Sequence, residues 1–160
     1  MNITLLFGYQ ALTKNETADY NTALGYKALN LNTTGTGNVA VGAQALDANT
    51  TASNNTAIGY QSLTGNTTGA SNTAVGKSAL GTSSTGAQNT AVGHNALVLS
   101  TTGNNNSAMG YNSGFNITTG YSNTALGAQA LYTVTTAAHN VAVGNDALKL
   151  STADNCVAVG

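Results

Sequence analysis

Two histidines and five carboxylates are the side chains whose chemistry could support catalysis or metal binding. His94 follows a glycine and His139 precedes an asparagine, so the two imidazoles occupy different places in the repeat described below and are more than two repeats apart. The carboxylates are scattered: Glu16, Asp19, Asp47, Asp146 and Asp154. An active site needs a nucleophile with its base, or a metal with its ligands, within reach of one another. The sequence therefore predicts no catalytic, cofactor-binding or metal site, and we expect the protein not to be an enzyme.

A second group of chemically capable residues consists of tyrosines beside polar side chains. Four tyrosines, Tyr9, Tyr26, Tyr60 and Tyr111, directly follow glycines that are separated by multiples of 17 residues. Aromatic rings next to amides suit contact with carbohydrate, because the ring offers an apolar face and the amide offers hydrogen bonds. The alternative is that each tyrosine stacks on the neighbouring repeat and stabilises the fold. Either role places these tyrosines at the surface.

The glycine that precedes these tyrosines marks a repeat that covers the whole chain. It recurs every 17 residues, with a last interval of 16, at Gly8, Gly25, Gly42, Gly59, Gly76, Gly93, Gly110, Gly127, Gly144 and Gly160. A fixed period of this kind is the signature of a repeat architecture. The sequence therefore predicts a single domain, residues 1–160, with nine repeats and the opening half of a tenth.

Other positions of the repeat are equally regular. The residue four before the glycine is Asn in eight repeats, and the residue directly before the glycine is aliphatic or aromatic. Ala or Ser follows three residues after the glycine, Leu follows four after it except at Gly114, and a Thr-Thr or Ser-Thr pair comes later. Disorder gives no reason to keep apolar residues in register, so the columns favour an ordered fold over a low-complexity segment.

A period of 17 residues is too short for a helical hairpin and matches one coil of a β-solenoid. We expect N-T-A-V-G to form one short strand in each coil and x-x-A-L-x to form a second. Stacked coils about 4.8 Å apart would make a rod of roughly 43 Å. Identical residues would lie above one another, with Asn side chains bonded amide to amide and Thr hydroxyls forming a similar ladder.

Alternation along the first strand predicts which residues face the interior of the coil. We expect the aliphatic residue before the glycine to point inward, together with the Thr, Val or Ser two residues earlier. The alanines between them would then form an apolar outer stripe: Ala23, Ala40, Ala57, Ala74, Ala91, Ala108, Ala125, Ala142 and Ala158. An exposed stripe of this length is typical of an interface, so these alanines are the predicted contact between chains.

Composition excludes several classes of partner. Only 6% of the residues are charged, and the formal net charge is −1. The four lysines are scattered, which argues against nucleic-acid binding. No apolar run is long enough to span a membrane, so we expect no membrane insertion. The single cysteine, Cys156, excludes an internal disulfide.

The motif N-[TV]-A-[VIL]-G-x-x-A-L, seen for example in residues 72–80, resembles the S-V-A-I-G-x-x-A-type repeats in the YadA-like heads of trimeric autotransporter adhesins. It also resembles the N-T-A-x-G-Y-x-A-L arrays of phage and bacterial tail-fibre-like proteins. The resemblance implies an all-β fold, a left-handed parallel β-roll that forms a side-by-side homotrimer. It also implies a location outside the cell or on the surface of a virion.

The function that follows is a structural or adhesive fibre segment that self-associates and presents a surface to a host receptor or glycan. Two alternatives remain open from the sequence. One is a filament of solenoids stacked head to tail, because an uncapped solenoid exposes a strand edge that templates pairing. The other is ice binding by the Thr columns. It is less favoured because the two Thr residues of each pair are adjacent and therefore point to opposite faces of a strand, whereas ice binding needs them on one flat face.

Overall fold

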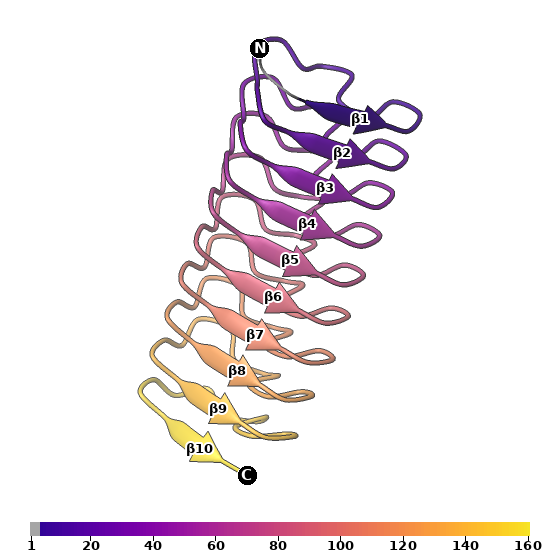
Figure 1. Cartoon of the computed structure of the whole chain (residues 1–160). Helices are drawn as coiled ribbons and strands as arrows, with labels where there is room; N and C mark the ends of the chain where they lie inside the picture. Colours follow the sequence, from indigo (N-terminus) through magenta and orange to yellow (C-terminus); the bar gives the residue numbers. More distant parts are fainter. Residues whose placement is uncertain (1–3) are drawn as a thin grey trace.

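The computed structural model describes residues 4–160, and the first three residues of the predicted 1–160 domain lie outside this range. Every strand is three residues long, and all ten pair in parallel, in chain order, within one sheet. The strands are β1 (Leu5–Phe7), β2 (Thr22–Leu24), β3 (Val39–Val41), β4 (Thr56–Ile58), β5 (Thr73–Val75), β6 (Thr90–Val92), β7 (Ser107–Met109), β8 (Thr124–Leu126), β9 (Val141–Val143) and β10 (Val157–Val159). Figure 1 shows the strands stacked as rungs, each followed by a loop that carries the chain around to the next. The prediction of a parallel β-solenoid of about nine coils is confirmed.

The register of the sheet matches the repeat. Ala57 of β4 pairs with Ala74 of β5, and Ala74 pairs with Ala91 of β6. The last interval is one residue shorter, yet Ala158 of β10 still pairs with Ala142 of β9. Like residues therefore stack on like residues from one end of the rod to the other.

The glycine after each strand is required by the close approach of successive coils. Gly76 has a φ of +131°, and a Cβ added there would lie 2.6 Å from the carbonyl oxygen of Gly93 in the next coil. No side chain fits that space, and L-residues avoid that backbone conformation. The glycine column is therefore a steric condition for stacking.

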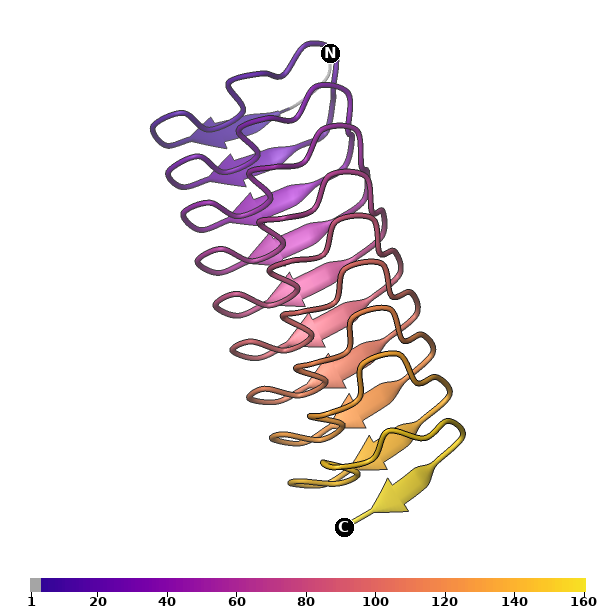
Figure 2. The same ribbon diagram turned by 180° about the vertical axis from the view of Figure 1, so that it is seen from behind.

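The predicted second strand is wrong, because x-x-A-L-x forms a turn. Lys27 and Leu29 both adopt the left-handed region, with φ of 56° and 52°. The N–H of Ala28 donates to the carbonyl of Gly25 at 3.3 Å, which closes the turn. In a turn, neighbouring side chains need not alternate between faces, and Ala28 and Leu29 are both fully buried. Seen from behind in Figure 2, this part of each coil is an irregular loop with no strand.

The predicted facing of the first strand is also wrong. The middle residue points inward in β2 to β9: Ala23, Ala40, Ala57, Ala74, Ala91, Ala108, Ala125 and Ala142 are at most 2% exposed. At the two ends, Leu6 of β1 is 52% exposed and Ala158 of β10 is half-buried. The aliphatic residues before the glycine point outward. The turn leucines already fill the interior, so the strand residue that faces them must be small. These alanines cannot be the contact between chains, because they lie inside the coil.

The Asn column before each strand is buried and forms a ladder, as predicted, but mostly with the backbone. The backbone N–H of Asn72 donates to Oδ1 of Asn55 at 2.9 Å, and Nδ2 of Asn72 donates to the carbonyl of Gly86 at 2.8 Å. Direct amide-to-amide bonds also occur, for example from Nδ2 of Asn89 to Oδ1 of Asn72 at 3.2 Å. Each Asn thus supplies the hydrogen bonds that a buried turn would otherwise lack.

The Thr hydroxyls also bond to the backbone and not to one another. Oγ1 of Thr33 donates to the carbonyl of Thr50 at 3.0 Å, and Oγ1 of Thr50 donates to the carbonyl of Thr67 at 3.1 Å. The expected ladder of hydroxyls is therefore a ladder of hydroxyl-to-carbonyl bonds. It ties successive coils together from Thr33 to Thr135.

A second buried column, which was not predicted from the sequence, lies three residues after the turn leucine. Its members are Asn32, Asn49, Asn66, Ser83, Ser100, Ile117 and Val134, all fully buried. The change to Ile117 coincides with the one repeat that has Gly114 in place of leucine. A Cβ at Gly114 would lie 2.8 Å from Cδ2 of Leu97 and 3.2 Å from Cδ1 of Ile117, so these two side chains occupy the space beside the glycine that replaces the leucine.

Candidate functional site

The outer side of the sheet is a long, chemically uniform surface of the described chain. We use "outer face" for the first and third residues of β2 to β9, namely Thr22, Leu24, Val39, Val41, Thr56, Ile58, Thr73, Val75, Thr90, Val92, Ser107, Met109, Thr124, Leu126, Val141 and Val143. All of them are exposed or half-buried, and none is charged. The aliphatic column of this face is an unbroken apolar stripe, which is the kind of surface that soluble chains normally cover.

The outer face is hollowed at one level. Its shallow depression is lined by Thr90, Ser107, Ala108, Met109, Thr124, Ala125 and Leu126. Ser107 lacks the methyl group that Thr or Val supplies at the same place in the other coils, which opens the depression between its neighbours. Beside it, Met109 is 51% exposed. This level thus combines the smallest first residue of the outer face with a long, flexible third residue.

The predicted surface tyrosines lie at the turn directly after each strand. Tyr9, Tyr26, Tyr60 and Tyr111 are all exposed. Tyr9 and Tyr26 stack with ring centroids 5.9 Å apart and planes 6° apart, and Tyr111 lies 5.6 Å from His94. Ring contacts with a neighbouring coil therefore account for three of the four tyrosines, with Tyr9 and Tyr26 stacked and Tyr111 tilted by 48° against His94.

Tyr60 differs because its column neighbours are Ala43 and Lys77, which offer no ring to stack on. The amides next to it are held in place, since Nε2 of Gln61 donates to Oε1 of Gln44 at 3.1 Å. Tyr60 and this amide pair are the combination of aromatic face and fixed polar groups that suits a carbohydrate ring.

The histidines are not brought together. His94 lies against Tyr111, and His139 meets the ring of Tyr121 edge-on at 5.1 Å. Among residues 4–160, no three His, Cys, Asp or Glu side chains are grouped in a way that could hold a metal ion.

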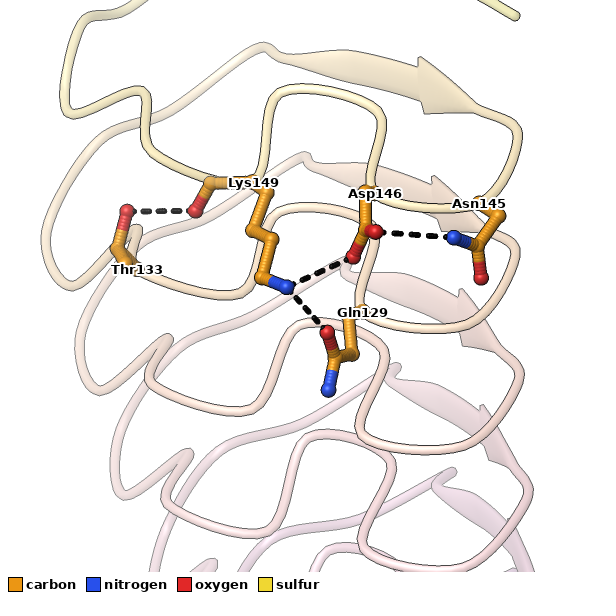
Figure 3. A network of polar contacts seen from close by, with 5 residues as sticks. All are labelled: Gln129, Thr133, Asn145, Asp146 and Lys149. Carbon is orange, nitrogen blue, oxygen red and sulfur yellow. Dashed lines mark hydrogen bonds and ion pairs between the residues drawn. The ribbon is translucent and has the colours of Figure 1, made fainter.

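A network of polar contacts lies at the turn after β9 and is drawn in Figure 3. Nζ of Lys149 lies 3.0 Å from Oδ1 of Asp146 and also donates to Oε1 of Gln129 in the preceding coil. Nδ2 of Asn145 donates to Oδ2 of Asp146 at 3.0 Å, and Oγ1 of Thr133 donates to the carbonyl of Lys149 at 2.7 Å. The ion pair is partly exposed and lies within one coil, so it contributes little to stability, and the bond from Lys149 to Gln129 is the contact that joins two coils. The cluster contains no nucleophile poised beside a base.

The described residues include no helix that is long and apolar enough to cross a membrane. Comparisons of the chain with models of protein families, with curated proteins and with solved structures find no match.

Proposed function

We propose that this chain is a non-enzymatic segment of a fibre, whose rods associate side by side through the outer face into a homotrimer. The outer face takes the role that the sequence assigned to the buried alanine column. The observation that supports the proposal is the aliphatic stripe of the outer face, which continues over eight strands without a charged residue. The resemblance of the repeat to adhesin-head and tail-fibre repeats supports a location outside the cell or on a virion.

The energetics of the outer face favour contact with another copy of itself. Covering a Val, Leu or Ile side chain yields at most about 1.5–3 kcal/mol, and the stripe repeats this gain in every coil. Because the face is uncharged, a second copy adds no like-charge repulsion. Rotation about an axis parallel to the rod brings the first residue of a strand opposite the third residue of the same strand in the next chain. In that arrangement Met109 of one chain fits beside Ser107 of another.

The proposal is tested by placing charge on the outer face. We expect the Val75→Glu, Val92→Glu double variant to be monomeric and to keep its β-sheet circular-dichroism signal, because both side chains point into solvent in a single rod. The measurement is native mass or light scattering at the same protein concentration as the parent chain.

The matched control is Leu31→Glu, which changes an exposed aliphatic residue outside the sheet. This control should associate like the parent. A monomeric parent chain would refute the proposal. Unchanged oligomer mass in the double variant would also refute the assignment of the interface to the outer face.

We propose further that the tyrosine turn presents the fibre to a host glycan, with Tyr60 as the platform. Tyr60→Ala should abolish retention on immobilised glycans, whereas Tyr26→Ala, which removes a ring stacked on Tyr9, should lower stability and leave retention intact. Equal retention of the two variants would exclude Tyr60 as the contact.

A further inference from the structure

The column of buried Asn and Ser inside the rod has polar groups that find no protein partner at one stretch. From Asn32 to Asn66 each amide continues a ladder, with Nδ2 of Asn49 donating to Oδ1 of Asn32 at 2.7 Å and Nδ2 of Asn66 donating to Oδ1 of Asn49 at 3.1 Å. In the two coils that follow Asn66, the residues of this column are Ser83 and Ser100. Oδ1 of Asn66 and both serine hydroxyls then have no hydrogen-bond partner, although all three residues are fully buried.

The backbone carbonyl groups beside these serines also accept one hydrogen bond fewer than their counterparts in the Asn coils. The carbonyl of Gly69 accepts two bonds, from Nδ2 of Asn55 at 3.0 Å and from Nδ2 of Asn66 at 2.9 Å. In the next coil, the carbonyl of Gly86 accepts from Nδ2 of Asn72, and the second donor that an Asn at position 83 would supply is replaced by the shorter Ser83. The same loss recurs at Gly103, which accepts from Nδ2 of Asn89.

We propose that two water molecules are bound inside the rod, one at Ser83 and one at Ser100, in the place of the missing Nδ2 groups. The water at Ser83 donates to Oδ1 of Asn66 and to the carbonyl of Gly86, and it accepts from the hydroxyl of Ser83. These three bonds are the usual number for a buried water. The part of the amide that serine lacks is close in size to a water molecule, which takes about 30 Å³ in the liquid.

The water at Ser100 repeats the arrangement one coil further on. It donates to Oγ of Ser83 and to the carbonyl of Gly103, and it accepts from the hydroxyl of Ser100. The hydrogen-bonded column then ends at Ile117, whose apolar side chain has no hydrogen-bonding group. Leaving these groups unpaired would cost on the order of 1–3 kcal/mol each, so water is the occupant that the chemistry requires.

A crystal structure of the full chain that resolves ordered water tests the proposal directly. We expect a water peak within about 3.2 Å of both Oδ1 of Asn66 and the carbonyl oxygen of Gly86, and a second peak between Ser83 and Ser100. Empty density at both places would overturn the inference.

Substitutions give a second readout in solution. Ser83→Asn should displace the first water and raise the midpoint of thermal unfolding by a few °C, whereas Ser83→Val should expel the water, leave Asn66 unpaired and lower the midpoint. Asn49→Ser, made within the intact ladder, is the matched variant that should gain a water. A more stable Ser83→Val, or an Asn49→Ser structure without a new water, would contradict the proposal.

Discussion

At the scale of single residues, the turn leucine decides which side of the strand enters the coil. Leu80 and Leu97 are fully buried, and they fill most of the interior that one short strand and its turns enclose. The facing strand residue must then be alanine, and the larger valine next to it is left outside. The same substitution should therefore affect stability differently at adjacent residues such as Ala91, which is inside the coil, and Val92, which is outside it.

Ala91→Glu should unfold the coils around it. The added carboxylate would enter a dry interior without a counter-charge, at a cost of several kcal/mol. The measurement is the free energy of unfolding in urea, with Val92→Glu as the matched control that should stay folded. A folded Ala91→Glu chain with parental stability would contradict the facing seen here.

Gly76→Ala should destabilise the rod by about 2–4 kcal/mol, because the new Cβ meets the backbone of the next coil and φ is +131°. Thermal unfolding monitored by circular dichroism measures the loss. Gly81→Ala is the control, since its φ is not in the left-handed region and its closest backbone neighbour is 3.2 Å away. Equal losses in the two variants would show that close stacking does not depend on the glycine column.

At the scale of elements, the strands are too short to hold the sheet alone, and the buried Asn column links each turn to the coils on both sides. Asn72→Ala removes the acceptor of the Asn89 backbone N–H and the donor to the Gly86 carbonyl. We expect a loss of about 2–4 kcal/mol in the free energy of unfolding, because two buried groups lose their partners. Asn145→Ala, at the surface, should change stability by less than about 0.5 kcal/mol. A loss at Asn72 no larger than that at Asn145 would mean that the ladder is dispensable.

At the scale of the whole molecule, each coil pairs only with its neighbours, so the rod should tolerate loss of a complete repeat. Deletion of residues 77–93 joins Gly76 to His94 and keeps every column in register. We expect a folded rod whose urea m-value is lower by roughly one ninth, because the surface exposed on unfolding scales with the number of coils. Deletion of residues 77–85 breaks the register and should abolish cooperative unfolding. Similar behaviour of the two deletions would argue against a stack built coil by coil.

The coil number, the parallel register and the Asn ladder were predictable from the sequence, because they follow from a period that can be counted along the chain. The turn that replaces the expected second strand was not predictable from the sequence. Lys27 and Leu29 adopt a positive φ there, and such residues rarely do so. That error produced the next one. With two alternating strands assumed, nothing indicated that the leucine fills the interior, and alternation assigned the aliphatic residue before the glycine to that place.

The candidate surface was therefore placed on the wrong residues, although the idea of an apolar outer stripe survives as a proposal. The tyrosines were placed correctly at the surface, since they follow a turn glycine. Whether each tyrosine has a stacking partner depends on the residue at the same position of the neighbouring coil. That residue is Tyr9 for Tyr26 and Ala43 for Tyr60.

By itself, the sequence determined that like residues stack once every 17 positions, because only a repeating coil keeps so many columns in register. The tertiary structure alone decided which columns lie inside, because that depends on how much volume one coil encloses and which side chain fills it first. The tertiary structure also decided where the buried polar column lacks protein partners. A serine in place of an asparagine leaves the period unchanged but removes a hydrogen-bond donor from the interior.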